Sequence, residues 1–130
     1  MADLIVADTD VIIDFFTDTK PISDTVSEII LQKRLSLTSM TVYELYAGIV
    51  GKKRLKQIEN LITRVPVFGL GVTEAAVAGK VYTHLKAKGR LIGNQDIIIA
   101  GICIANDLPL LTKNTTHFSI IPQLNLYSVA

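Results

Sequence analysis

Short apolar stretches alternate with segments of helical periodicity along the whole chain, and this alternation constrains the fold more than any other feature. The apolar stretches that predict strands are residues 4–8, 34–38, 65–70, 108–112 and 124–129. The first of them, LIVAD, is continuously apolar up to its last residue, which is typical of a strand covered on both faces. Strands that alternate with helices form layered α/β folds, so we expect a mainly parallel central sheet of about five strands flanked by helices.

The segments between the strands carry three kinds of helix signal: capping residues, apolar positions at helical spacing, and glycine stops. Helices are expected from Ser23 or Asp24 onward, from Ser39 to near Gly48 or Gly51, and over residues 52–64, 73–89 and 94–107. Thr73 is the expected cap of the helix over 73–89, and Gly89 is its expected stop. The last segment, NQDIIIAGICIAND, is apolar almost all round, which predicts a deeply buried central helix.

The length and composition of the chain limit the classes of protein to which it can belong. A chain of 130 residues is large enough for one core and too small for two, so residues 1–130 are expected to form a single domain. Its 13 basic and 12 acidic residues leave a net charge of +1, so any nucleic-acid binding must come from local clustering. Cys103 is the only cysteine, which excludes an internal disulfide and a multi-cysteine zinc site.

No targeting or membrane signal is visible in the sequence. The start, MADL, is acidic where a signal peptide requires positive charge. The longest apolar run, Ile97 to Ala105, is far shorter than the ~18 residues that a membrane span requires. We therefore expect a cytoplasmic protein with no membrane partner. Its mean hydropathy of +0.42 is high for such a protein and predicts an exposed apolar patch for a partner or for self-association.

Carboxylates gather where the predicted strands end. Asp8 and Asp10 come at the end of the first strand, and ligands of parallel α/β sheets bind beyond the carboxyl ends of the strands. Glu44 lies on the helix after the second strand, and Asp96 lies at the start of the buried helix, where the helix dipole stabilises negative charge. Each also has an ordinary structural explanation: Asp8 and Asp10 as caps, Glu44 in a salt bridge, and Asp96 as an N-cap.

Two more oxygen donors, Thr112 and Asn114, follow the fourth predicted strand, where Asn114 could also be a turn former. Carboxylate and amide oxygens at one sheet edge, with no cysteine or histidine ligand among them, suit a hard cation such as Mg²⁺ or Mn²⁺. A cation that is bound by few protein ligands can hold a phosphate and generate hydroxide from a bound water. The group therefore predicts metal-assisted hydrolysis of a phosphodiester.

Four sequence blocks carry a resemblance that spans essentially the whole chain: DTDVIIDFF at 8–16, SMTVYELYAG at 39–48, IGNQDIIIAGICIAND at 92–107 and LLTKNTTHF at 110–118. With these blocks in this order, the chain resembles the PIN-domain ribonucleases, and more narrowly the VapC-type toxins of toxin–antitoxin modules. The resemblance implies a PIN-like three-layer fold and a Mg²⁺- or Mn²⁺-dependent endoribonuclease that cleaves structured RNA of the tRNA or rRNA class. It also implies a homodimer that acts as the toxin of a type II pair and binds a cognate antitoxin.

The same resemblance implies roles for individual residues. The expected catalytic residues are Asp8, Glu44, Asp96 and Asn114. Asp8 and Asp96 are expected to bind the metal, and Glu44 and Asn114 to bind it directly or through water. The expected supporting residues are Thr9, Asp10 and Thr112. Asp10 would reach the metal through water or support Asp8.

Basic residues near these blocks could contact the phosphates of an RNA. Arg90 precedes the block that contains Asp96, and Lys113 lies inside the last block, so these two are the expected RNA contacts. Arg90 is equally consistent with a cation that stabilises the end of the preceding helix. The Lys52–Lys56 cluster is expected to be a solvated helix face, and His117 a turn residue beside the site rather than a base.

Two alternative functions fit parts of the pattern. A PIN fold could bind RNA or a protein without catalysis; the retained acids disfavour this alternative, and it stays open. A phosphatase with an Asp-x-Asp nucleophile is disfavoured more strongly, because its chemistry requires a lysine followed by an acidic pair, whereas Lys113 follows Asp96 and Asp107. Glu44 would also have no role in a phosphatase.

Overall fold

A four-stranded parallel sheet forms the centre of the protein. In a computed structural model, which describes residues 3–128, its strands are β1 (Ile5–Ala7), β2 (Leu35–Thr38), β3 (Val67–Phe68) and β4 (Leu110–Leu111). They are arranged in the order β3-β2-β1-β4, and each neighbouring pair is parallel. Strand β1 therefore lies inside the sheet, and its carboxyl end meets the carboxyl ends of β2 and β4 at one edge.

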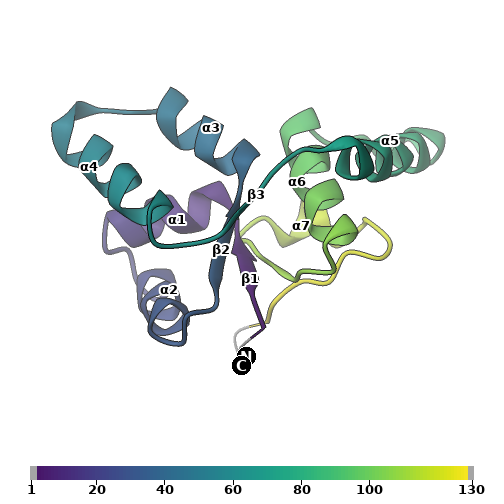
Figure 1. Ribbon diagram of the computed structural model, residues 1–130. Helices are drawn as coiled ribbons and strands as arrows, with labels where there is room; N and C mark the ends of the chain where they lie inside the picture. Colours follow the sequence, from purple (N-terminus) through teal and green to yellow (C-terminus); the bar gives the residue numbers. More distant parts are fainter. Residues whose placement is uncertain (1–2, 129–130) are drawn as a thin grey trace.

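Helices cover both faces of this sheet (Figure 1). One face is covered by α1 (Thr9–Phe16), α2 (Ile22–Leu31), α3 (Ser39–Ala47) and α4 (Gly51–Ile62). The other face is covered by α5 (Val72–Ala87), α6 (Asn94–Ala105) and α7 (Thr115–Phe118). The three layers confirm the predicted α/β class with its parallel sheet and flanking helices. Among the described residues, no helix has the length and apolar character needed to cross a membrane.

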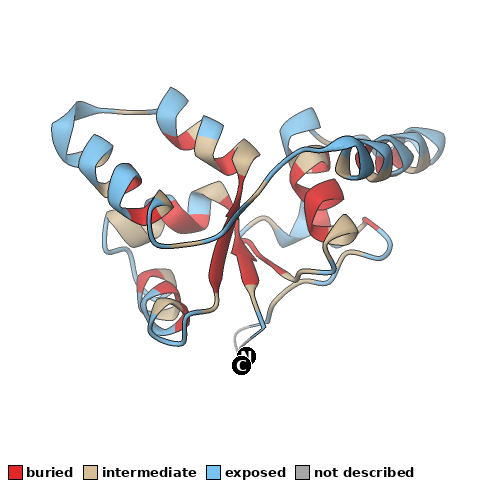
Figure 2. Cartoon of the chain, in the orientation of Figure 1, coloured by how far each residue is buried: buried red, intermediate tan, exposed pale blue. Residues whose placement is uncertain are grey.

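The continuously apolar sequence of β1 follows from the burial of both faces of the sheet. Ile5, Val6 and Ala7 are all fully buried (Figure 2). Ile5 and Ala7 belong to the core that packs against α1, α2 and α4, whereas Val6 belongs to the core that packs against α5 and α6. Because neighbouring residues of a strand point to opposite faces, a strand between two helical layers is buried at every position, which favours apolar residues throughout.

The buried central helix is also as predicted. Helix α6 spans Asn94–Ala105, and six of its residues, from Ile97 to Cys103, are buried. Burial raises the pKa of the Cys103 thiol to about 12, so this cysteine stays protonated and inert at neutral pH.

Several predicted boundaries and caps are wrong in detail. The stretches over 65–70 and 108–112 contain strands of only two residues each, β3 and β4. Within the described part of the stretch over 124–129, one parallel bridge joins Leu126 to Leu110, and residue 129 lies outside the described residues. Helix α3 is capped by Thr38 rather than by Ser39, and helix α5 follows Gly71 with no side-chain cap from Thr73.

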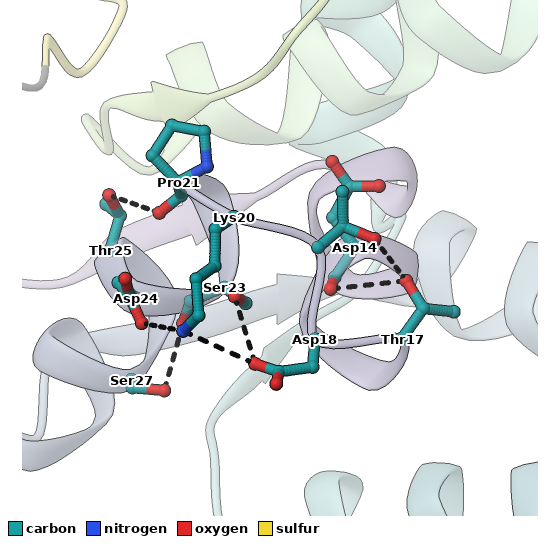
Figure 3. A network of polar contacts seen from close by, with 10 residues as sticks. Asp14, Thr17, Asp18, Lys20, Pro21, Ser23, Asp24, Thr25 and Ser27 are labelled. Atoms are coloured by element: carbon teal, nitrogen blue, oxygen red, sulfur yellow. Dashed lines mark hydrogen bonds and ion pairs between the residues drawn. The ribbon is translucent and has the colours of Figure 1, made fainter.

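The connection between α1 and α2 is held by polar contacts rather than by the cap expected at Ser23 or Asp24 (Figure 3). Lys20 Nζ lies 2.7 Å from Asp24 Oδ1 and 3.7 Å from Asp18 Oδ1, and Ser23 Oγ donates to Asp18 Oδ1 at 3.3 Å. Asp24 pairs with Lys20 instead of capping the helix, because α2 begins after Pro21. These contacts connect the turn after α1 to the first residues of α2.

Helices α5 and α6 approach each other most closely at Gly101. A Cβ atom added to Gly101 would lie 2.7–2.9 Å from the Cβ, Cα and N atoms of Ala78 on α5. Two of these three atoms belong to the backbone of Ala78, so a side chain at Gly101 could be accommodated only by moving one helix. Gly101 thus sets the separation of the two helices and, with it, the position of the N-terminal end of α6.

We expect the substitution Gly101→Ala to lower the free energy of unfolding by about 1–3 kcal/mol, because overpacking at a helix–helix contact outweighs the better helix propensity of alanine. Gly79→Ala is the matched control, because a Cβ at Gly79 on α5 meets no atom within 4 Å. Gly79→Ala should raise stability by about 0.5–1 kcal/mol through helix propensity alone. Urea unfolding of both variants measures the difference, and equal effects would show that Gly101 does not limit the approach of the helices.

Candidate active site

Asp8 joins the end of β1 to the start of α1. It is the N-cap of α1, and its Oδ1 accepts a hydrogen bond of 2.8 Å from the backbone N–H of Thr9. Its Oδ2 accepts a hydrogen bond of 2.8 Å from the hydroxyl of Thr112, which follows β4. The residue is only 6% exposed. The predicted capping role is therefore correct, and the same carboxylate is buried at the edge of the sheet.

The environment of Asp8 makes its negative charge costly. Burial raises the pKa of Asp8 from 3.8 to about 6, the hydrogen bonds from Thr112 and Thr9 oppose this increase, and the nearby charges of Asp96 and Asp10 add to it. At neutral pH the carboxylate is still mainly ionised. A shift of this size corresponds to about 3 kcal/mol of unfavourable free energy, which a bound cation would relieve.

Glu44 is connected to the same region through Thr9. The Thr9 hydroxyl donates to Glu44 Oε1 at 2.7 Å, and its oxygen lies 3.0 Å from the hydroxyl oxygen of Thr41. Thr41 is fully buried, and its N–H donates to the capping hydroxyl of Thr38 at 3.1 Å. The cap of α3 and the first residue of α1 thus jointly orient Glu44. The alternative of a Glu44 salt bridge is wrong, because no ion pair to Glu44 occurs among residues 3–128.

Asp96 lies in the first turn of α6, but it does not cap this helix. The N-cap is Gly93, so the N-cap explanation of Asp96 is wrong. Asp96 Oδ2 lies 3.3 Å from His117 Nδ1, and the same ring nitrogen lies 2.9 Å from Asn114 Nδ2. Helix α7, which begins after Asn114, brings His117 into the site.

Hydrogen bonds run from one side of the site to the other. The backbone N–H of Asn114 donates to the Thr112 hydroxyl at 3.0 Å, and that hydroxyl donates to Asp8. From Asn114 the contacts continue through His117 to Asp96. Within the described part of the chain, no group of three or more His, Cys, Asp or Glu side chains is arranged to hold a metal ion. The carboxylates of different elements are therefore linked through intervening threonine, asparagine and histidine side chains rather than by direct contact.

The remaining predicted residues differ in how they relate to the site. Asp10 is exposed in the first turn of α1, and its charge acts on Asp8. Lys113 forms an ion pair with Asp14, with its Nζ 2.7 Å from Asp14 Oδ2, and this contact is the main reason why the pKa of Lys113 is raised. Arg90 lies between α5 and α6 and is exposed. The RNA contacts of Arg90 and Lys113 and the metal-binding and catalytic roles stay predictions.

The contacts of one residue of this region, His117, were not foreseen from the sequence, and another residue, Asp14, was missed. His117 was expected beside the site as a turn residue, whereas its ring contacts both Asn114 and Asp96. Its position three residues after Asn114 was the available signal, because this spacing brings side chains together in a helical turn. Asp14 was not singled out, and its spacing of four residues from Asp10 on α1 was the corresponding signal.

An apolar cavity lies on the same helical layer but outside the site. Its volume is about 570 Å³, and it is lined by residues of α1, α2, α4 and the start of the β3 region, among them Phe15, Phe16, Ile30, Leu61 and Val65. None of the site carboxylates lines it. The polar candidate site at the sheet edge is therefore separate from this cavity.

Comparison with known protein families identifies the fold. Residues 5–122 match the family described as the PIN domain. The chain belongs to the PIN-domain family. This result confirms the predicted family and the three-layer α/β fold, and the matched region includes every residue of the candidate site.

The curated relatives of this PIN domain are VapC proteins. It is 32% identical to Ribonuclease VapC1 of Haemophilus influenzae (strain R2866) over 123 residues, which cover 90% of this chain and 91% of the relative. It is 32% identical to Ribonuclease VapC3 of Methanocaldococcus jannaschii over 97 residues, covering 75% and 95% of the two chains. It is also 29% identical to the tRNA(fMet)-specific endonuclease VapC of Shigella flexneri, covering 72% and 74%.

Solved structures with the same fold include VapBC complexes. VapBC2 of Rickettsia felis, bound to a DNA fragment from its promoter, matches this PIN domain with a TM-score of 0.85 at 22% identity, covering 98% and 99% of the two chains. VapBC-1 of nontypeable Haemophilus influenzae matches with a TM-score of 0.81 at 27% identity, covering 96% and 97%. The match over nearly the full length of both chains shows that the α/β layers described above are those of these proteins.

The raised pKa of Asp8 predicts how the stability of the metal-free protein depends on pH. Because the folded-state pKa of about 6 exceeds 3.8, the folded state binds more protons between these values, and the free energy of unfolding falls as pH rises through this window. We expect Asp8→Asn to remove this dependence and to be about 1–3 kcal/mol more stable than the parent at neutral pH. Urea unfolding in a chelating buffer across this pH range tests it. An Asp8→Asn variant that is less stable at neutral pH would contradict it.

Proposed function

We propose that this PIN-domain protein is a Mg²⁺- or Mn²⁺-dependent endoribonuclease that cleaves structured RNA and acts as the toxin of a type II toxin–antitoxin pair. One observation carries the proposal: Asp8 is a buried carboxylate whose pKa is raised by burial and by the charge of Asp96. A buried carboxylate with a second acidic side chain nearby at a sheet edge is typical of a site completed by a cation. The VapC ribonuclease relatives support the activity.

The donor chemistry of the site fits such a cation. The available atoms are carboxylate, amide and hydroxyl oxygens, the ligands preferred by Mg²⁺ and Mn²⁺. Mg²⁺ keeps several waters and commonly needs only one or two protein carboxylates. A site built on Asp8 and Asp96, with Glu44 and Asn114 bound directly or through water, therefore requires no preassembled group of three acidic residues. When bound, the cation lowers the pKa of a coordinated water and stabilises negative charge on the phosphate.

The side chains of the protein supply orientation. The Thr9 N–H and the Thr112 hydroxyl each donate a hydrogen bond to one oxygen of Asp8, so the orientation of this carboxylate is fixed. The Thr9 hydroxyl holds Oε1 of Glu44 by a hydrogen bond of 2.7 Å. Fixed carboxylates of this kind need little rearrangement when the substrate phosphate arrives, which is the main catalytic advantage of a preorganised site.

A PIN fold that binds RNA or a protein without cleavage is the remaining alternative. It would require no burial of charge at Asp8, and the unfavourable free energy of that charge disfavours it. The phosphatase alternative is disfavoured further, because Lys113 is paired with Asp14 rather than with the opening Asp-x-Asp acids.

The proposed partners are RNA, a cognate antitoxin and a second copy of the chain, in the cytoplasm. The structural neighbours from Rickettsia felis and Haemophilus influenzae are VapBC complexes, which supports an antitoxin partner. The relative from Shigella flexneri is named as specific for tRNA(fMet), which supports a structured RNA as substrate. Large apolar side chains are exposed on α3, just before α4 and at the start of α5: Tyr43, Val50 and Val72 are 63%, 85% and 90% exposed. Exposed apolar groups of this kind support the proposed self-association or antitoxin contact.

We expect Asp8→Asn and Asp96→Asn each to lower cleavage of structured RNA by at least about 100-fold in Mg²⁺ or Mn²⁺, because each removes a charged oxygen from the proposed metal site. Asp107→Asn is the matched control: Asp107 is exposed and has a φ of 53°, a conformation that asparagine adopts equally well. Cleavage of a labelled tRNA mixture, with circular dichroism to verify folding, measures the effect. Equal cleavage by the parent and both site variants would overturn the catalytic assignment.

Expression of the chain alone in a bacterial host should arrest growth, and the antitoxin encoded by a neighbouring gene should relieve the arrest. The Asp8→Asn chain, produced at the same level, should be harmless because it lacks the proposed metal ligand. Growth curves with matched immunoblots provide the measurement. If the parent cleaves RNA in vitro but leaves growth unchanged, the nuclease proposal survives and the toxin role is wrong.

A further inference from the structure

His117 lies between two of the residues proposed to act on RNA. Its Nδ1 is 3.3 Å from Asp96 Oδ2 and 2.9 Å from Asn114 Nδ2. Asp96 belongs to α6, whereas Asn114 precedes α7, so the imidazole ring connects two separate elements. None of the roles assigned above involves this ring.

The backbone at His117 is held in place by the residue that follows it. Phe118, the next residue, is fully buried, and its N–H donates to the carbonyl of Asn114 at 3.3 Å. The His117 side chain is 48% exposed, so part of the ring faces solvent while Nδ1 faces Asp96 and Asn114. Among residues 3–128, His117 is the only side chain within hydrogen-bonding distance of the Asp96 carboxylate or of the Asn114 amide.

We propose that His117 is a positioning residue that holds Asp96 and Asn114 for the cation and the RNA; this inference rests on the proposed function. A carboxylate can only accept, so a proton on Nδ1 is donated to Asp96. With the proton on Nε2 instead, Nδ1 accepts from the amide of Asn114. In either tautomer the ring restrains at least one of the two side chains, and without the ring both are released.

Loss of the His117 ring should therefore lower the affinity for the metal and leave the chemical step unchanged. Side chains that are already oriented lose less conformational freedom when a ligand binds, so the restraint favours binding. Removing a group that orients a metal ligand typically weakens metal binding by about 10–100-fold. The substitution should not alter the carboxylate and amide atoms themselves, so sufficient metal should restore activity.

The test compares His117→Leu with His117→Asn and with Thr116→Leu. Asparagine places an amide near the position of Nδ1 and should restore part of the restraint, whereas leucine at the exposed Thr116 controls for an apolar side chain on α7. The first measurement is Mg²⁺ and Mn²⁺ binding to the RNA-free protein by calorimetry. We expect affinity to fall about 10–100-fold in His117→Leu, less in His117→Asn, and not in Thr116→Leu.

Two further measurements separate positioning from other roles. In the metal-free protein, the NMR signals of the Asn114 side-chain amide should shift and exchange faster in His117→Leu than in the parent. In RNA cleavage, His117→Leu should need more Mg²⁺ for half-maximal rate and regain the parent rate at saturating Mg²⁺. A defect that persists at saturating Mg²⁺ would overturn the positioning role, and so would unchanged metal affinity.

Failure of this inference is distinguishable from failure of the proposed function. If Asp8→Asn abolishes cleavage while His117→Leu binds metal as tightly as the parent, only the role of His117 is wrong. If Asp8→Asn and Asp96→Asn cleave like the parent, the metal-dependent nuclease is wrong and the inference about His117 falls with it.

Discussion

The candidate site is built around one unfavourable burial, that of the Asp8 carboxylate at the carboxyl end of β1. Two hydrogen bonds, from the N–H of Thr9 and the hydroxyl of Thr112, make this burial tolerable without neutralising the charge. The first bond also starts α1, and the second ties the end of β4 to the end of β1. A neutral capping residue such as asparagine would keep the cap of α1 without burying a charge, so the charge is better explained by function than by folding.

The layers of the fold explain how the charged side chains of the site are positioned. Strand β1 is buried on both faces, between a core shared with α1, α2 and α4 and a core shared with α5 and α6. The close contact of Gly101 with Ala78 places α6 against α5, and α6 carries Asp96 in its first turn. Glu44 is placed from the opposite layer by the hydroxyl of Thr9. The site therefore collects charged groups from both helical layers at the one sheet edge where they meet.

Much of this could be predicted from particular residues. The run LIVAD indicated a doubly covered strand, the apolar segment over 94–107 indicated a buried helix, and acids after two strands indicated a site at their carboxyl ends. Short-range details were less predictable. Thr38 rather than Ser39 caps α3, and α2 begins after Pro21, because capping depends on where the preceding strand or turn releases the chain. The two-residue strands β3 and β4 are shorter than their apolar stretches, since pairing also requires a neighbouring strand.

By itself, the sequence determined the layered α/β class, the parallel sheet and the set of oxygen-bearing residues at its edge, because these follow from periodicity and from the order of elements. Only the tertiary structure decided which of these residues touch. Thr112 is separated from Asp8 by 104 positions, and His117 from Asp96 by 21, so their contacts depend on how helices and strands pack. The pairing of Lys113 with Asp14 and the placement of His117 between Asp96 and Asn114 were decided in the same way. Side-chain contacts across elements arise from packing in three dimensions, and no local pattern encodes them.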